Sequence, residues 1–338
     1  MNKAKVRDGR IELMRFVASI FIMIGHMGYI NFSKARPFEG AWFYVEFFLI
    51  LTGYFTARHF LSGKAFGENK VKVSIDYTLK KFIRFLPYTT GAVLVWYLFK
   101  MLPDLQAEHL GALKSLEDMP FEMLFLSAAN TNGSHLFTIW FLSAMFLTLP
   151  ALCLILQISN KYIVLLLSFY FSVIYYLFRY DYGSHVYPNQ MIRVFCGMML
   201  GVLVYFVSQK LREKELSRAL KAVLSVIEIL AVLFPIITAG LNISVLRFDL
   251  LAFFVSSVLI FSGQTFNSTL SNPFFSYLGK ISMPIYIWHL AVSAVVQYYF
   301  PNSSDHVRIF LFFAGTMVIS IVNDSAVTLV KKKCKSRS

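Results

Sequence analysis

The sequence predicts an all-α membrane protein in which about ten transmembrane helices form a single bundle. Hydrophobic residues make up 57% of the 338 residues and charged residues only 15%, whereas soluble domains carry about 25% charged residues. Ten apolar stretches approach the length of roughly 20 residues that a spanning helix needs. Basic residues also gather at alternate connections between these stretches. Together these observations exclude a soluble globular protein.

The expected helices follow one another along the whole chain. At roughly 20 residues each, ten spans use about 200 residues and leave enough for loops. We therefore expect one domain over residues 1–338, with no appended soluble domain. The first stretch follows basic residues, as a signal peptide does. Its length, its Arg15 and His26, and the lack of a small-residue cleavage site indicate a retained helix instead. The ten stretches are approximately 11–31, 41–60, 82–101, 135–157, 161–178, 190–209, 219–240, 248–266, 281–300 and 308–330.

The positive charge has a topological explanation. A net charge of +14 in a soluble protein would suggest nucleic-acid binding, but Lys and Arg also accumulate in the cytoplasmic loops of membrane proteins. Here they gather in the amino end, in the second and sixth loops and in the tail after residue 330. We therefore expect both termini in the cytoplasm, membrane lipids as neighbours and no nucleic-acid partner. The acidic loop 102–134 is expected outside, where it is a candidate for substrate selection or a simple cap.

Cysteine usage indicates neither a disulfide framework nor a metal site. The chain has three cysteines, which form no CxxC pair and leave an odd number. We interpret Cys153, Cys196 and Cys334 as inert apolar residues and expect no metal. The chain also contains no GxxxxGK[ST], GxGxxG, GxSxG or HExxH motif.

Three ionisable residues inside the first two spans are the main candidates for function. A charged side chain in mid-bilayer costs about 2.5 to 3.5 kcal/mol on translocon scales, so such residues are rarely incidental. Arg15 and His26 are eleven positions apart, which is about 16 Å along a helix and returns nearly to the same face. If the second span runs inward, Glu46 reaches about the depth of His26. The two side chains are therefore expected to meet.

This expected pair has two interpretations that the sequence leaves open. In the catalytic one, Glu46 holds one nitrogen of His26, and the other nitrogen takes a proton from an acceptor hydroxyl. In the structural one, a buried pair merely ties two helices together.

Further polar residues each have a functional and a structural interpretation. Lys80, Lys81 and Arg84 begin the third predicted span, where they could bind a phosphate group or simply reach lipid phosphates. Trp140 could point its indole N–H into a cavity or belong to an interfacial belt. His289 is either a site residue or a histidine bonded to a neighbouring helix.

Five segments, in order along the chain, resemble the motifs of the integral-membrane acyltransferase family 3. Arg15-x10-His26 is similar to the opening Arg-x10-His motif of that family. The stretch from Glu46 to Phe55 is similar to its acidic-x-Phe-Phe-x-Leu-Ser-Gly-Phe element. The remaining three are Lys81-x-x-Arg84-x-x-Pro87, Trp140-Phe141-Leu142, and Leu278-Gly279-x-x-Ser282 followed by Tyr286 and His289. Lys81 stands where the family has arginine, which keeps the charge but loses bidentate phosphate contact. Thr52 replaces the usual serine.

The resemblance implies an O-acyltransferase, with acetyl-CoA or another acyl-CoA in the cytoplasm as donor and a hydroxyl of a cell-surface or lipid-linked glycan as acceptor. It implies the bacterial inner membrane as location. His26 would be the general base, or else a transient acyl carrier, with Glu46 orienting it. The CoA phosphates would be held by Arg15, Lys81 and Arg84, and the site would be lined by Trp140, Tyr286 and His289.

Two other function classes remain open. Polar residues inside a bundle also mark the pathway of a transporter or flippase for an anionic or lipid-linked substrate. Matched halves with broken spans would favour that class, and the sequence shows none. The third possibility is a non-catalytic sensor or assembly partner.

Overall fold

In the computed structural model, every regular element among the described residues is helical. The structure describes residues 8–29, 38–62, 67–106, 116–129, 136, 138–178, 189–243, 246–267, 270 and 272–335. The short elements are η1 (Met27–Tyr29), η2 (Glu39–Tyr44), α5 (Met119–Met123) and η3 (Ser127–Ala129). The long helices are α1 (Gly9–Gly25), α2 (Val45–Phe60), α3 (Lys70–Gln106), α6 (Ile139–Leu156), α7 (Lys161–Phe178), α8 (Asn189–Arg212), α9 (Arg218–Gly240), α10 (Leu246–Ser262), α11 (Pro273–Tyr299) and α12 (Asp305–Lys335).

Six of these helices are long and apolar enough to cross a membrane, namely α3, α6, α8, α9, α11 and α12. α7 is apolar but shorter, and α1, α2 and α10 have 17, 16 and 17 residues. The predicted all-helical membrane fold is therefore confirmed for the described residues, and the protein is an integral membrane protein. The expected count of about ten spans is not confirmed.

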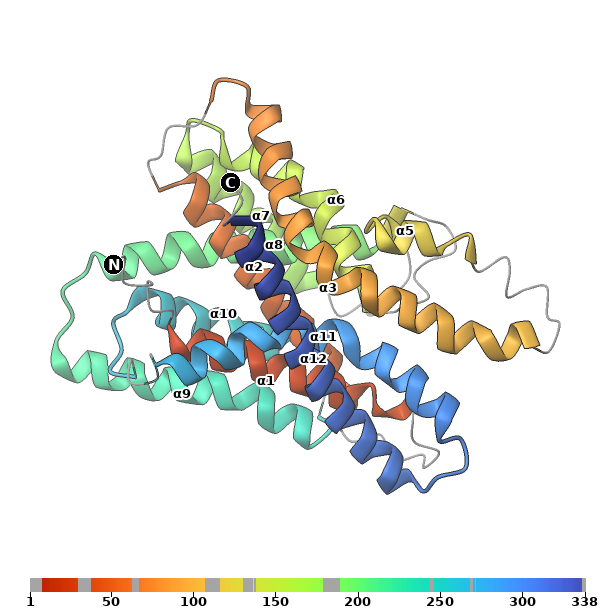
Figure 1. Ribbon diagram of the computed structural model, residues 1–338. Coiled ribbons are helices and arrows are strands. Elements are labelled where there is room, and N and C mark those ends of the chain that lie inside the picture. The colour runs from red at the N-terminus through yellow and green to blue at the C-terminus, as the bar shows by residue number, and fades with distance from the viewer. Residues whose placement is uncertain are drawn as a thin grey trace.

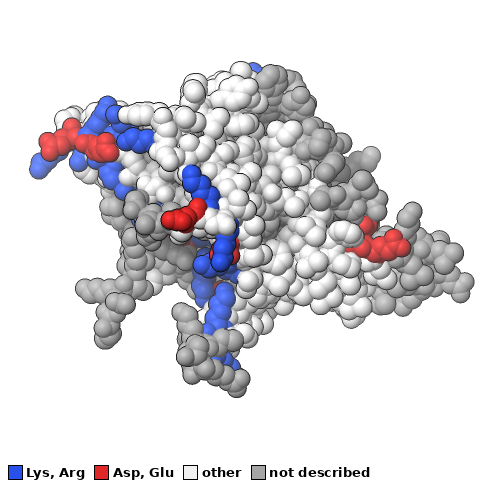
Figure 2. Space-filling model, turned by 90° about the horizontal axis from the view of Figure 1, so that it is seen from above, with Lys and Arg blue, Asp and Glu red and all other residues white. Residues whose placement is uncertain are grey.

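The helices pack around α11, which contacts α1, α12 and α3, while α2 packs on α8 (Figure 1). Lys and Arg gather over one part of the face shown in Figure 2, and most of the remaining surface there is uncharged. The arrangement leaves α1 and α11 side by side in the middle of the molecule.

Two glycines permit the close crossing of α2 and α8. A Cβ atom on Gly53 would lie 1.8 Å from the Met198 carbonyl oxygen, and one on Gly201 would lie 2.1 Å from that of Ile50. Small residues allow such a backbone approach between membrane helices. The crossing fixes the start of α2, which carries Glu46, against α8.

A buried ion pair attaches the start of α1 to α9. The Arg10 guanidinium lies 3.0 Å from Glu228, and it also bonds Asp8, the N-cap residue of α1. Thr265 donates to the same Glu228 carboxylate. Arg10, one of the basic residues of the amino end, therefore also joins α1 to α9.

Three helix boundaries differ from the predicted spans by six or more residues. α1 ends at Gly25, before the predicted end at 31, so His26 is its C-cap residue. α3 begins at Lys70, so Lys81 and Arg84 lie inside the helix instead of at its start. α11 begins at Pro273 because Asn272 caps it and proline suits the first helical position. Apolar stretches mark the body of a helix, whereas a capping residue such as Asn272 marks where it begins.

Candidate active site

His26 closes α1 with a fixed orientation of its ring. Its Nδ1 lies 2.7 Å from the Ile22 carbonyl oxygen, one turn earlier in the helix. A carbonyl oxygen can only accept, so we assign the hydrogen to Nδ1 and the lone pair to Nε2. Nε2 is therefore the nitrogen of His26 that can take up a proton.

His289, fully buried in α11, is the residue that the structure places against His26. Its Nε2 lies 3.3 Å from His26 Nδ1, and the ring centroids are 5.0 Å apart. The other nitrogen, Nδ1, lies 3.3 Å from the Ile285 carbonyl oxygen and so carries the hydrogen. His289 Nε2 can then accept from His26 Nδ1–H, which supports the same tautomer of His26.

A second contact between α1 and α11 lies nearer the start of both helices. A Cβ on Gly279 would lie 1.7 Å from Glu12 Oε2, so only glycine fits beside this buried carboxylate. Glu12 in turn pairs with Arg15, at 3.0 Å from its Nη1. The two helices run parallel, with Arg15 toward the start of α1 and His26 at its end.

Glu46 lies in a buried polar cluster with residues of α7 and α8. It accepts from Arg193 Nε at 2.8 Å and from the Tyr175 hydroxyl. Both Glu46 and Arg193 are less than a tenth exposed. The Arg193 guanidinium lies 4.9 Å from the centre of the Trp140 ring, a cation–π arrangement. Whereas the sequence predicts a meeting of Glu46 with His26, the partners described for these two residues differ.

Tyr286 lies between the histidine pair and this cluster. Its ring centroid is 6.2 Å from that of His289, and Arg193 is within electrostatic reach of its hydroxyl. The hydroxyl donates to the Thr138 carbonyl at 2.9 Å, just before α6 begins. Contacts thus lead from His289 through Tyr286 to Arg193, which packs on Trp140 and bonds Glu46.

Two candidate donor-binding cations, Lys81 and Arg84, lie one turn apart on α3 and have different neighbours. Lys81 points toward α2, where its Nζ is 3.3 Å from Thr56 Oγ1. The same ammonium lies 5.0 Å from the ring centre of Tyr77, one turn earlier on α3. Arg84 is exposed and lies within electrostatic reach of Lys331 on α12. Lys280, whose ammonium is 2.7 Å from Asp324, adds to this group. We call Arg84, Lys280 and Lys331 the basic cluster.

Among the described residues, no three His, Cys, Asp or Glu side chains form a group that could hold a metal ion. Cys153 and Cys196 are buried free thiols, in agreement with their interpretation as apolar residues. The side chain of Cys334 and much of the acidic loop 102–134 lie outside the described residues.

Sequence reasoning overlooked three residues of this region: Arg193, Tyr175 and Glu12. Arg193 carries a usable signal, because it is a charged residue inside the predicted span 190–209. Glu12 precedes Arg15 by three positions, the spacing of a helical ion pair. Nothing in the sequence singles out Tyr175, because α7 contains several tyrosines and phenylalanines.

Comparison with known proteins gives one match. A family model described as an acyltransferase domain, acyltransferase 3, matches residues 8–322, nearly the whole chain. No curated protein and no solved structure matches. The matched segment includes His26, Glu46 and His289, whereas Asp324 and Lys331 follow it.

Proposed function

Because the chain belongs to the acyltransferase 3 family, we propose that it is a membrane O-acyltransferase. It transfers an acetyl group from cytoplasmic acetyl-CoA to a hydroxyl of a cell-surface or lipid-linked glycan. The observation that carries this proposal is the contact between His26 and His289 at the end of α1. A family of acyl-transferring enzymes and an oriented imidazole together favour base-catalysed transfer.

The histidine pair performs the proton transfer in this proposal. His26 Nε2 takes the proton from the acceptor hydroxyl while the hydroxyl oxygen attacks the thioester carbon. The new C–O bond forms, the C–S bond breaks, and the CoA thiolate takes the proton back from His26. His289 is a positioning residue, because it accepts from Nδ1–H and so keeps the lone pair on Nε2.

Glu46 acts in the proposal through the residues that it holds. Its carboxylate fixes Arg193 over Trp140 and bonds Tyr175, which shapes the buried wall beside Tyr286. A preorganised wall of this kind keeps a bound acyl group in place with little reorganisation.

The donor enters from the basic end of the bundle. Lys81 and Arg84 are one turn apart on α3 and bind the CoA phosphates by charge-assisted hydrogen bonds. Arg15 lies eleven residues before His26, about 16 Å along the helix, so it marks the path of the pantetheine arm. This arrangement requires both termini to be cytoplasmic, and we assign the protein to the bacterial inner membrane.

Direct donor binding tests the proposal. Acetyl-CoA is titrated into the full chain in detergent, with Arg84→Ala as test variant and Lys161→Ala, an exposed lysine on α7, as control. We expect roughly tenfold weaker binding for Arg84→Ala, the loss of a hydrogen bond to a charged group, and no change for the control. No binding of acetyl-CoA at millimolar concentration would favour a transporter or a sensor.

The acceptor is identified by mass spectrometry of envelope glycans from cells with and without the protein. The proposal predicts an acetyl group on a hydroxyl that is lost when the gene is deleted. Identical glycans in both strains would contradict the assignment of a glycan acceptor.

A further inference from the structure

Three cations converge on one buried carboxylate in the basic cluster of Arg84, Lys280 and Lys331. Lys280 on α11 donates to Asp324 of α12 at 2.7 Å and to the Thr328 hydroxyl at 3.0 Å. Lys331 lies within electrostatic reach of both other cations and of Asp324. The cluster therefore joins α3, α11 and α12 at the basic end of the bundle.

Contacts with Asp324 and Tyr88 hold the two lysines of the cluster in place. Asp324 is 3% exposed, and it also accepts from the Tyr88 hydroxyl at 3.4 Å. The Lys331 ammonium lies 5.8 Å from the centre of the Tyr88 ring, a cation–π arrangement. Both ammonium groups are thus kept at one place, whereas an ordinary surface lysine moves freely on its flexible stem.

The positive charge of the cluster exceeds its negative charge. Three cations and one carboxylate leave two excess positive charges. Among the described residues, neither Arg84 nor Lys331 forms an ion pair. Like charges at close range repel one another, and a bound anion relieves that repulsion. All three cations are exposed, so an anion can reach them.

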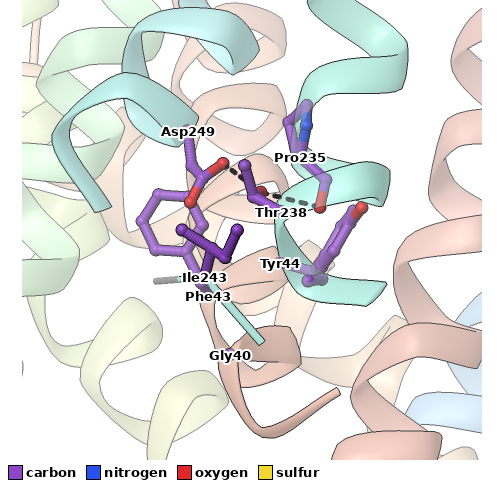
Figure 3. A pocket seen from close by; sticks show the side chains of 8 residues that line it. Gly40, Phe43, Tyr44, Pro235, Thr238, Ile243 and Asp249 are labelled. Atoms are coloured by element: carbon purple, nitrogen blue, oxygen red, sulfur yellow. Dashed lines mark hydrogen bonds between the residues drawn. The ribbon is translucent and has the colours of Figure 1, made fainter. Parts of the chain in front are cut away.

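A surface cluster sets no limit on the size of the molecule that carries the anion. The small pocket between η2, α9 and the start of α10, by contrast, has room for about one water molecule (Figure 3). Its Asp249 already accepts from the Thr238 hydroxyl at 2.7 Å. A phosphate group on a molecule as large as a nucleotide therefore fits the basic cluster and not this pocket.

A phosphomonoester matches the charge of the cluster. It carries about 1.5 to 2 negative charges at pH 7, whereas a phosphodiester carries a single one. Arg and Lys bind phosphate oxygens by charge-assisted hydrogen bonds. CoA has such a group, its 3′-phosphate, in addition to the diphosphate that bears the pantetheine arm. Phosphatidic acid presents the same group at a membrane surface.

The position of the cluster favours the acyl donor as the source of this phosphate. Gly279, the residue before Lys280, packs against Glu12, where a Cβ would lie 1.7 Å from the carboxylate. Glu12 in turn pairs with Arg15 at 3.0 Å. The cluster therefore lies at the same end of α11 as Arg15, which is on the proposed path of the donor.

Buried polar groups lead along α12 from the cluster toward His289. The Thr316 and Ser320 hydroxyls are fully covered and have no hydrogen-bond partner among the described residues. Thr316, Ser320 and Asp324 follow one another at intervals of one turn, so they are neighbours on the helix. Phe312, one turn before Thr316, has its ring centroid 6.5 Å from that of His289. This direction suits a donor bound at the cluster, because the proposed reaction takes place at the histidine pair.

We propose that the basic cluster binds a phosphomonoester, and that this group is the 3′-phosphate of the acyl donor. Arg84 and Lys331 donate to its oxygens, while Lys280 stays on Asp324 and adds its charge. Lys81, on the side of α3 that faces α2, is left for the diphosphate. The identification of the ligand as the donor rests on the proposed function. The preference for a phosphomonoester rests on the charges of the cluster alone.

Binding of acetyl-CoA and of acetyl-3′-dephospho-CoA to the full chain in phosphatidylcholine nanodiscs tests the proposal. The two compounds differ only in the phosphomonoester. We expect acetyl-CoA to bind at least roughly tenfold more tightly, the effect of hydrogen bonds between charged groups. Lys331→Gln should lose most of this preference, whereas Lys214→Gln, at an exposed position after α8, should keep it.

The preference is a ratio of two affinities, so it separates phosphate recognition from folding. A variant that merely loosens α12 weakens the binding of both compounds and leaves the ratio unchanged. Lys280→Gln is the second variant, because its amide can still donate to Asp324 while the charge is lost, and its ratio should fall as well. An unchanged ratio in both lysine variants would overturn the proposal.

A second arm identifies a lipid as the source of the phosphate. Native mass spectrometry counts the phosphatidic acid that wild type and Lys331→Gln retain from nanodiscs containing this lipid. Retention that depends on Lys331, together with equal binding of the two CoA compounds, would overturn the assignment to the donor and place a lipid at the cluster.

The two arms also separate this proposal from the proposed function. If neither CoA compound binds, the proposed function fails, and the lipid arm alone decides whether the cluster binds a phosphomonoester. If both CoA compounds bind equally and no retention of phosphatidic acid depends on Lys331, the phosphomonoester site is refuted while the proposed function stands.

Discussion

The tautomer of His26 depends on two acceptors, the Ile22 carbonyl and His289 Nε2. Replacing His289 by leucine removes one of them, so that of these two acceptors only the Ile22 carbonyl still holds the ring. We expect kcat to fall about 10- to 100-fold, the usual effect of losing an orienting partner, with an unchanged KM for acetyl-CoA. Steady-state kinetics measures both.

The conservative variant separates positioning from packing. The side-chain carbonyl of His289→Gln can still accept from His26, so part of the lost kcat should return. Equal rates for wild type and His289→Leu would remove His289 from the mechanism.

Glu46 and Arg193 form a buried ion pair whose partners depend on each other. Glu46→Gln leaves the guanidinium buried without its counter-charge, which typically costs about 3 to 5 kcal/mol. We expect a clear drop in the thermal unfolding midpoint in detergent. Glu213→Gln, at an exposed position after α8, serves as control, and an equal midpoint for both variants would contradict the buried pair.

At the level of elements, the α2–α8 crossing depends on the absence of two side chains. A Cβ on Gly53 or Gly201 would overlap a carbonyl oxygen, so either alanine variant must push the helices apart. Overpacking costs typically about 1 to 3 kcal/mol or more, and we expect a lower yield of folded protein in size-exclusion chromatography. Gly67→Ala should elute as the wild type does, and normal elution of Gly53→Ala would refute the close crossing.

The helices could be predicted from the sequence, but which helices pack against one another could not. Each apolar stretch contains one of the long helices, and six of these helices are long and apolar enough to cross a membrane. The meeting of His26 and His289 could not be predicted, since it requires knowing that α1 and α11 pack side by side although they are far apart in sequence. Depth alone suggested Glu46 as the partner of His26. The contacts described for Glu46 are with Arg193 and Tyr175, and its meeting with His26 stays a prediction.

The same limit applies to the residues proposed to bind the acyl donor. The sequence shows the motif that contains Lys81 and Arg84, but the spacing of the motif does not reveal that the two side chains have different neighbours. Lys81 contacts Thr56, whereas Arg84 joins Lys280 and Lys331 in the basic cluster.

On the scale of the whole molecule, the proposal requires the basic end to be cytoplasmic and the His26 end to be outside. In a Cys334→Ser background, a membrane-impermeant maleimide added to intact cells should label Asn302→Cys, between α11 and α12. It should not label Glu215→Cys, between α8 and α9, until the cells are opened. Both positions are exposed, so the reverse pattern would invert the topology and contradict the direction of transfer.

The central claim is that His26 accepts the proton of the acceptor hydroxyl. It is tested most directly by following labelled acetyl from acetyl-CoA to the glycan with purified protein in nanodiscs, comparing wild type with His26→Gln. We predict that the variant binds acetyl-CoA normally and transfers acetyl at least about 100-fold more slowly, as expected when a general base is lost. Transfer at the wild-type rate by correctly folded His26→Gln would contradict the account.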